Sequence, residues 1–299
     1  MFGQLVQNIV KKHENSMKHI VLHIFPLILI TNIFSCIDKP IYTSKVSIYT
    51  DQNIQNYWNN FNFKDSDFCE NFSNTEYYFD KFIKKIHISS EDSAQKAIKN
   101  MLSLCEKYNY SLSYFRELYD KYLYDPDSPY LNENLYSFVL QYILSSQYIN
   151  ESNKSIARFQ LNMINKNQVG DIANDFIFID PFGKLSSLSK KSAEYTVLFF
   201  NIPDCAECIR VKNVINNLSF SPQKIRILAI YPGKDEKIWN ETDYPKEWIN
   251  GYDIGESILS NNLYDLRAFP TIYLLDKNKH VLIKDATIEE LESYFANTK

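Results

Sequence analysis

The chain has 299 residues, which is enough for two domains of ordinary size. Hydrophobic residues make up 45% of it and charged residues 23%, a composition typical of a globular protein and not of a disordered one. The formal net charge of -4 disfavours nucleic acid as a partner, and the 6 glycines form neither a GxGxxG nor a GxxxxGK[ST] phosphate-binding motif.

The first informative stretch is an apolar run at residues 20–34. It is shorter than the roughly 20 residues of a membrane-spanning helix and closer to the core of a secretory signal. The run ends in IFSC, which resembles the lipobox of bacterial lipoproteins, and the resemblance implies cleavage before Cys36 and lipid attachment to it. We therefore expect a signal peptide over residues 1–36, with Met17 as the true start. An uncleaved apolar anchor is the alternative.

Between about residues 50 and 160, apolar residues recur at spacings of three and four, as on the buried face of a helix. The pattern predicts helices around residues 78–86, 94–105, 112–122 and 132–147. Ser90 is a suitable N-cap for the second of these, and the two prolines of DPDSP at 125–129 end the third. We expect a helical domain over residues 37–165, with its many aromatic residues in the core and its rim; a ligand site is the alternative.

Two of the 5 cysteines, Cys69 and Cys105, fall in this helical region. In an oxidising compartment they could form a disulfide. They could equally be two separate buried thiols, which behave as small hydrophobic side chains. The sequence leaves both interpretations open.

From about residue 170 the pattern changes to strands that alternate with helices. Strands are predicted at Phe176–Asp180, Tyr195–Asn201, Ile225–Tyr231, Thr271–Asp276 and His280–Lys284. The last two form a hairpin across the polar turn DKNK, and Thr287 with Glu290 matches a capping box that opens a final helix. We expect an α/β domain over residues 166–299.

Two cysteines three positions apart, Cys205 and Cys208, follow the predicted strand at Tyr195–Asn201. Helical spacing beyond them places Cys205 at the first turn of a helix, where free N–H groups and the helix dipole favour a thiolate. Cys208, one turn further, can then resolve a mixed disulfide. A zinc site would need further ligands, and none of the five histidines lies near the pair in sequence. A static structural disulfide is the other alternative.

A buried strand, C-x-x-C at a helix start and a later proline that opens a strand resemble the thioredoxin fold. The matching proline is Pro270, in the run LYDLRAFPTIYLLD. The resemblance implies a cis peptide bond at Pro270, packed beside the two cysteines. It also implies that the backbone at Phe269, with Thr271 after the proline, binds an extended substrate segment through main-chain hydrogen bonds.

Motifs along roughly residues 50–299 resemble a family of Gram-negative envelope lipoproteins. They include YLYDPDSPYLNE, KNQVGDIANDF, FFNIPDCAEC and WINGYD. Members join a helical domain of unknown role to a C-terminal thioredoxin-like domain, and that domain also looks like the membrane-tethered thioredoxins of cytochrome maturation. The resemblance implies a lipid-anchored thiol–disulfide oxidoreductase with no cofactor and no metal. It would lie in the outer membrane facing the periplasm, act on disulfide-containing envelope proteins and depend on a membrane electron donor.

The sequence departs from the thioredoxin pattern around the first cysteine. Asp204 replaces the usual tryptophan, and Phe199 stands where thioredoxins carry a buried acid. Asp204 and Glu207 are acidic and therefore oppose a thiolate at Cys205, which predicts a reducing couple. Glu207 is also a candidate proton acceptor, although a solvated surface residue is the alternative.

Other functional classes remain as alternatives to this enzyme. The stretch GDIANDFIFID looks similar to peroxiredoxins, but their PxxxTxxC motif is absent, because Ile202 stands at the threonine position. A non-catalytic thioredoxin-like binding or scaffold lipoprotein is the main alternative, and a functional centre in the helical half is another. The prediction is that Cys205 attacks a substrate disulfide and Cys208 resolves the intermediate.

Overall fold

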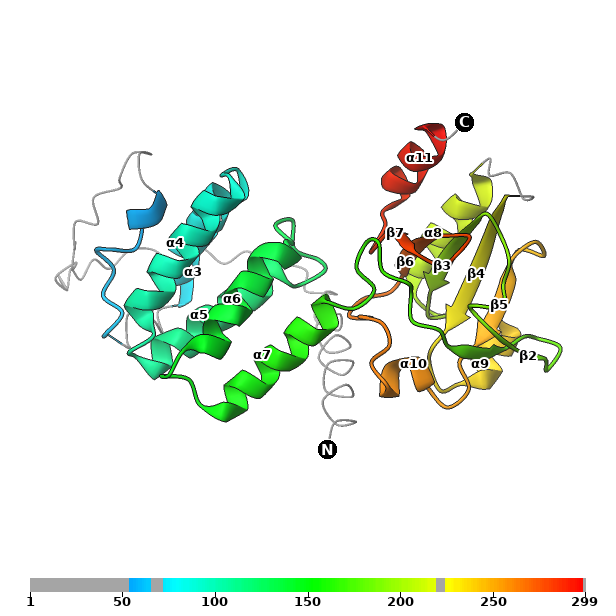
Figure 1. Cartoon of the computed structure of the whole chain (residues 1–299), viewed down its shortest axis with the longest axis horizontal. Coiled ribbons are helices and arrows are strands. Elements are labelled where there is room, and N and C mark those ends of the chain that lie inside the picture. The colour runs from blue at the N-terminus through cyan, green and yellow to red at the C-terminus, as the bar shows by residue number, and fades with distance from the viewer. Residues whose placement is uncertain (1–53, 66–71, 219–223, 298–299) are drawn as a thin grey trace, which may run out of the picture. The chain divides into compact units, whose positions relative to one another are not determined.

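The computed structural model describes residues 54–65, 72–218 and 224–297, in which a set of helices is followed by a mixed β-sheet (Figure 1). These residues belong to one compact unit, Ile48–Lys299. The predicted signal peptide and Cys36 lie outside the described residues. Within the described part of the chain, no helix has the length and apolar character needed to cross a bilayer.

Side-chain caps define the starts of several helices in the N-terminal half. Its elements are a short 3-10 turn η2 (Ile54–Asn56) and the α-helices α3 (Phe72–His87), α4 (Glu91–Cys105), α5 (Asn109–Leu123), α6 (Glu133–Ser145) and α7 (Glu151–Ile164). Ser90 accepts a hydrogen bond from the N–H of Ser93, which confirms the predicted cap of α4. Asn132 and Asn150 cap α6 and α7 in the same way. The four predicted helices are confirmed, and α7 is an additional one.

The core of the helical half is rich in aromatic rings. Trp58 packs edge-on against Phe82 and Phe115, with ring centroids 5.7 and 5.4 Å apart. Phe79, Phe82 and Phe115 are fully buried, so the expectation that the aromatic residues form a core holds for these rings. Cys105 is buried in the same core and its thiol donates to the carbonyl of Leu102 at 3.4 Å. Its proposed partner Cys69 lies outside the described residues.

The C-terminal half is built on one seven-stranded sheet in the order β2-β1-β5-β4-β3-β6-β7. The strands are β1 (Ile177–Ile179), β2 (Leu185–Ser187), β3 (Tyr195–Phe200), β4 (Ile225–Tyr231), β5 (Ile249–Tyr252), β6 (Thr271–Asp276) and β7 (Val281–Ile283). β3, β4 and β5 are parallel, whereas β6 runs antiparallel to β3 and β7 to β6. The five predicted strands are confirmed, and β2 and β5 are strands that the sequence did not predict.

Strand β3 is covered on both faces, which explains its continuous apolar sequence. The helices of this half are α8 (Ala206–Asn217), α9 (Glu236–Glu241), α10 (Ser257–Ser260) and α11 (Ile288–Asn297). Val197 and Phe199 pack in a core with side chains of α8 and α11. Leu198 and Phe200 point to the opposite face and join a second core that includes Tyr264.

The predicted capping box at the start of α11 is present. The N–H of Thr287 donates to the Glu290 carboxylate at 2.9 Å, and the N–H of Glu290 donates to the Thr287 hydroxyl at 3.2 Å. The reciprocal pair fixes the point where the chain turns from the β-sheet into its last helix.

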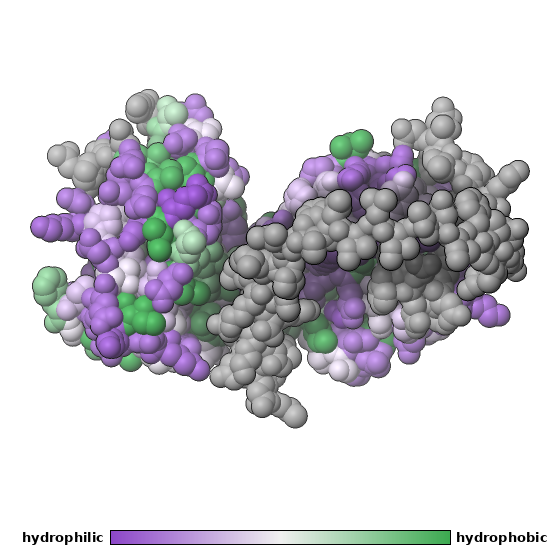
Figure 2. All heavy atoms as spheres, turned by 180° about the vertical axis from the view of Figure 1, so that it is seen from behind, coloured by the Kyte–Doolittle hydropathy of each residue, from purple (hydrophilic) through white to green (hydrophobic). Residues whose placement is uncertain are grey.

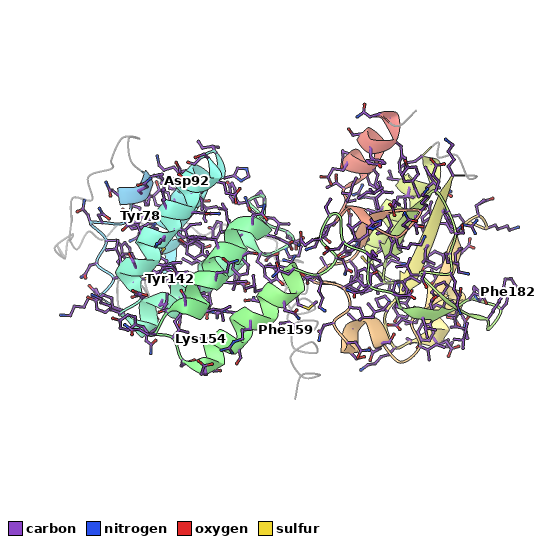
Figure 3. The ribbon with its side chains drawn as sticks, in the orientation of Figure 1. Tyr78, Asp92, Tyr142, Lys154, Phe159 and Phe182 are labelled. Carbon is purple, nitrogen blue, oxygen red and sulfur yellow. The ribbon has the colours of Figure 1, made fainter. Side chains whose placement is uncertain are left out.

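Solvent-facing residues in the described chain are mostly hydrophilic on the face shown in Figure 2, with hydrophobic residues in small separate groups. Phe182, at the turn between β1 and β2, is 94% exposed and points away from the hairpin (Figure 3). This ring therefore contributes to none of the hydrophobic clusters of the sheet.

Gly251 provides a test of the packing in the sheet. A Cβ atom on this residue of β5 would lie 2.6 Å from a ring carbon of Phe178 and 2.7 Å from Cδ1 of Ile230, closer than non-bonded carbons approach. We expect Gly251→Ala to lower the free energy of unfolding by about 1–3 kcal/mol, because overpacked cores must shift. Urea unfolding monitored by circular dichroism measures the change.

Ser186→Ala in the edge strand β2 is the control, because Ser186 lies outside both cores of the sheet. Its effect should stay within about 0.5 kcal/mol. Equal unfolding midpoints for the two variants would show that Phe178 and Ile230 move aside without loss of stability, contrary to this expectation.

Candidate active site

Cys205 occupies the N-cap of helix α8, directly after the loop that leaves β3. Its backbone is extended, with φ -83° and ψ 117°, and its Sγ accepts a hydrogen bond from the N–H of Cys208 at 3.1 Å. The N–H of Cys205 itself donates to the carbonyl of Ile202 at 3.2 Å and closes the loop. The free N–H groups of the first turn of α8 therefore point toward this sulfur.

Cys208 lies one helical turn further and differs from Cys205 in exposure. Cys208 is only 3% exposed, whereas Cys205 is half-buried. Burial raises the pKa of the Cys208 thiol, and its hydrogen bond with Cys205 raises that pKa further. The pair therefore consists of one accessible sulfur and one sheltered sulfur that keeps its proton at neutral pH.

The segment before β6 approaches the cysteines from the next strand of the sheet. The peptide bond between Phe269 and Pro270 is cis. The Cys205 thiol lies 3.6 Å from the carbonyl oxygen of Phe269, to which it donates. Thr271 is buried and its hydroxyl donates to the carbonyl of Ala268 at 2.7 Å, which tightens the turn around the proline. The structure thus brings the predicted residues Cys205, Cys208 and Phe269 together.

Glu207, the candidate proton acceptor, is engaged by a neighbour on its own helix. The Arg210 guanidinium donates to both oxygens of the Glu207 carboxylate, at 2.8 and 2.6 Å. This hydrogen bonding lowers the pKa of Glu207 and makes its carboxylate a weaker base. The ion pair also offsets part of the negative charge that the sequence places next to Cys205.

Two polar residues near Cys208 were missed by the sequence reasoning. Asn201, buried at the end of β3, donates to the carbonyls of Phe199 and Ile230 and accepts a 2.5 Å hydrogen bond from the Tyr244 hydroxyl. Both side chains line a small hollow with Cys208. Burial raises the pKa of Tyr244, so its phenol remains a hydrogen-bond donor. Asn201 could have been noticed as a polar residue ending an apolar strand, whereas Tyr244 has no local signal.

No group of three or more His, Cys, Asp or Glu side chains is arranged to hold a metal ion among the residues that the structure describes. The local chemistry that the described site offers is that of two thiols, one amide and one phenol.

Comparison with known proteins gives matches over most of the chain. Residues 52–167 match a family profile described as a domain of unknown function, DUF5106. The crystal structure of a thioredoxin-like protein from Bacteroides caccae is 33% identical, with a TM-score of 0.72, over 82% of this chain and 91% of that chain. The chain belongs to this thioredoxin-like family. The expected union of a helical domain with a C-terminal thioredoxin-like domain is confirmed.

Other solved structures match less than half of the chain. The C-terminal domain of an uncharacterized protein from Bacteroides fragilis is 41% identical, with a TM-score of 0.43, over 44% of this chain and 98% of that chain. A thiol-disulfide oxidoreductase from Bacteroides fragilis is 22% identical, with a TM-score of 0.34, over 43% of this chain and 100% of that chain. A comparison with curated proteins gave no match.

The different environments of the two sulfurs predict different reactivity. In the reduced protein at neutral pH, iodoacetamide should modify Cys205 at least about tenfold faster than Cys208, because the thiolate is the reactive form and burial raises the pKa of Cys208. Fragmentation mass spectrometry locates the alkyl group on the peptide that carries both cysteines.

The two single serine variants serve as controls. Cys208→Ser should keep the fast modification at this peptide, and Cys205→Ser should lose it. Faster labelling of Cys208 than of Cys205 would overturn the assignment of the accessible sulfur.

Proposed function

We propose that this protein is a thiol–disulfide oxidoreductase in which Cys205 is the nucleophile and Cys208 the resolving residue. The observation that carries the proposal is the capping geometry: a half-buried sulfur at the start of α8 accepts the N–H of a buried second cysteine. Membership of a thioredoxin-like family supports the same chemistry. A static disulfide would not need one sulfur to stay accessible.

The reaction follows from the positions of the two sulfurs. The Cys205 thiolate attacks one sulfur of a substrate disulfide, so an S–S bond breaks and the second substrate sulfur leaves as a thiolate. Cys208 then gives up its proton, for which the departing thiolate is a suitable acceptor, and attacks the Cys205 sulfur of the mixed disulfide. The substrate sulfur bound to Cys205 then leaves as a thiolate and takes a proton from water, so the substrate has two thiols and the protein keeps a Cys205–Cys208 disulfide. Two electrons from a separate thiol donor return it to the reduced state.

The turn around Pro270 is the proposed substrate-binding element. Because the Phe269 carbonyl lies beside Cys205, an extended segment that paired with the backbone here would bring its own sulfur close to the nucleophile. We assign disulfide-containing proteins of the cell envelope as substrates and a membrane protein as the electron donor. Lipidation of Cys36 would hold the enzyme on the periplasmic side of the outer membrane, as the lipobox-like sequence IFSC suggests.

Trapping the mixed disulfide tests the proposed reaction. Cys208→Ala removes the resolving thiol, so the intermediate on Cys205 should persist as a covalent adduct that dithiothreitol releases. Cells that express the variant, alkylated before lysis, should show such adducts on non-reducing gels, and mass spectrometry identifies the attached proteins.

The double variant Cys205→Ala/Cys208→Ala is the control and should give no adduct. A non-catalytic binding or scaffold protein, the alternative function, would bind its partners without a covalent link. Pull-down from a native lysate would then recover the same partners with the double variant and no covalent adduct with either variant. That result would contradict the enzymatic proposal.

A further inference from the structure

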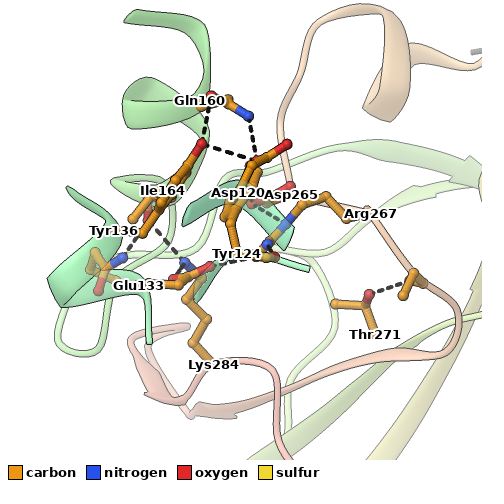
Figure 4. Close-up of polar contacts among 12 residues, drawn as sticks. Asp120, Tyr124, Glu133, Tyr136, Gln160, Ile164, Asp265, Arg267, Thr271 and Lys284 are labelled. Atoms are coloured by element: carbon orange, nitrogen blue, oxygen red, sulfur yellow. Dashed lines mark hydrogen bonds and ion pairs between the residues drawn. The ribbon is translucent and has the colours of Figure 1, made fainter. Parts of the chain in front are cut away.

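A network of charged side chains joins helix α6 to the segment that precedes Pro270 (Figure 4). Glu133, the first residue of α6, uses both carboxylate oxygens in this network. One accepts from the Arg267 guanidinium at 2.5 Å and the other from the Lys284 ammonium at 2.7 Å. Lys284 also donates to the carbonyl of Ile164, the last residue of α7, at 2.9 Å. Glu133 therefore links two cations of the thioredoxin-like half to the helical half.

Tyr124, the residue that follows helix α5, contacts the same segment at several points. The Arg267 guanidinium carbon lies 3.6 Å from the centre of the Tyr124 ring, and one guanidinium nitrogen donates to the Tyr124 carbonyl. The Tyr124 hydroxyl donates to the carboxylate of Asp265 at 3.3 Å. That carboxylate also forms an ion pair with Arg267 at 3.0 Å. Arg267 thus stacks on the Tyr124 ring with one face and pairs with Glu133 and Asp265 through its nitrogens.

These charges are more sheltered from solvent than the Glu151–Arg158 ion pair within α7. The side chains of Asp265 and Lys284 are 3% and 8% exposed, and those of Glu133 and Arg267 are 19% and 20% exposed. Glu151 and Arg158, which pair within α7, are 75% and 53% exposed. Removing one member of a sheltered group leaves its partners desolvated and unpaired, whereas exposed pairs contribute little. The network therefore constrains the residues that it joins.

The helical side of the contact is braced by further hydrogen bonds. The rings of Tyr124 and Tyr136 stack with centroids 4.8 Å apart. The Tyr136 hydroxyl donates to Asp120 at 3.0 Å, and Gln160 donates to the same carboxylate at 2.9 Å. These hydrogen bonds therefore join helices α5, α6 and α7 next to the residues that contact Arg267.

The segment at residues 263–270 has neither helical nor strand structure, so no regular backbone ladder holds it. Arg267 lies two residues before Phe269, whose carbonyl faces Cys205. We propose that the helical domain positions the substrate-binding turn of the redox site, and that Glu133 is the positioning residue that holds Arg267. This inference rests on the proposed oxidoreductase function and gives the helical domain a part in it.

The proposal separates two kinds of substrate. A protein disulfide must pair with the backbone around Phe269, so displacement of this turn should slow its reaction. A small disulfide without peptide groups, such as hydroxyethyl disulfide, needs only the Cys205 thiolate. Loss of the Glu133 charge should therefore change the ratio of the two rates, which a general loss of stability would not do.

The experiment uses the reduced full chain and its Glu133→Gln variant, which keeps the shape of the side chain and removes its charge. Insulin disulfides should oxidise the two cysteines of the variant about tenfold to a hundredfold more slowly than those of the wild type. Small misplacements of reacting groups change rates by factors of this size. The rate with hydroxyethyl disulfide should stay within about twofold, because Cys205 keeps its cap. Acid quenching, alkylation and mass spectrometry measure both rates.

Glu151→Gln is a matched control. Glu151 is also the first residue of a helix with an asparagine cap, but its partner Arg158 lies on its own helix. This variant should react with both disulfides at the wild-type rates. Amide hydrogen exchange at residues 265–269 should quicken in Glu133→Gln and not in Glu151→Gln.

The possible results separate the two proposals. Unchanged rates in Glu133→Gln, or equal losses with both disulfides, would overturn the positioning role and leave the oxidoreductase function standing. Failure of the wild-type chain to react with either disulfide would overturn both. If Glu133→Gln does not fold, Arg267→Met removes the ion-pair partner of Glu133 from the turn while keeping an apolar stem. It should show the same selective loss, and unchanged rates or losses of equal size with both disulfides would then refute the positioning role.

Discussion

The hydrogen bond from the Cys208 N–H to the Cys205 sulfur is the contact on which the site depends. Helix caps usually place an oxygen at this point, as Ser90 and Asn132 do in the helical half. Here a sulfur takes the place of that oxygen, so the group that caps the start of the helix is also the proposed nucleophile. Folding of α8 and presentation of the nucleophile therefore require one and the same local geometry, and a negative charge on Cys205 strengthens the cap instead of disrupting it.

Sheet topology explains why Pro270 lies near these cysteines. Strand β6 runs antiparallel to β3, and their register pairs Phe200, the last residue of β3, with Thr271, the first of β6. The chain that leaves β3 toward Cys205 and the chain that enters β6 through Pro270 therefore meet at the same end of the sheet. A slip of this register by one residue would turn every β3 side chain to the opposite face, and both cores of the sheet resist that change.

Local patterns predicted most of the fold because their causes are local. The apolar run of β3, the cap at Ser90 and the capping box of α11 each depend on residues close in sequence. Strand β5 was not predicted because its sequence is INGY, in which Gly251 and an asparagine weaken the β signal. In the site, the cysteine pair and the proline carried recognisable motifs. The Tyr244–Asn201 hydrogen bond and the Arg267–Glu133 ion pair join residues 43 and 134 positions apart, and nothing in the intervening sequence marks them.

The polar character of the contact at Glu133 suits a positioning task. Apolar contacts between two halves of a chain bury surface without fixing direction, and they allow small shifts. A guanidinium that hydrogen-bonds a carboxylate and stacks on a ring has a defined plane and a defined set of partners. Removing these charges from water costs free energy, so the network contributes to the orientation of Arg267 more than to the stability of the fold. The proposed substrate-binding turn gains from a fixed orientation, and Arg267 is close enough to Phe269 along the chain to transmit it.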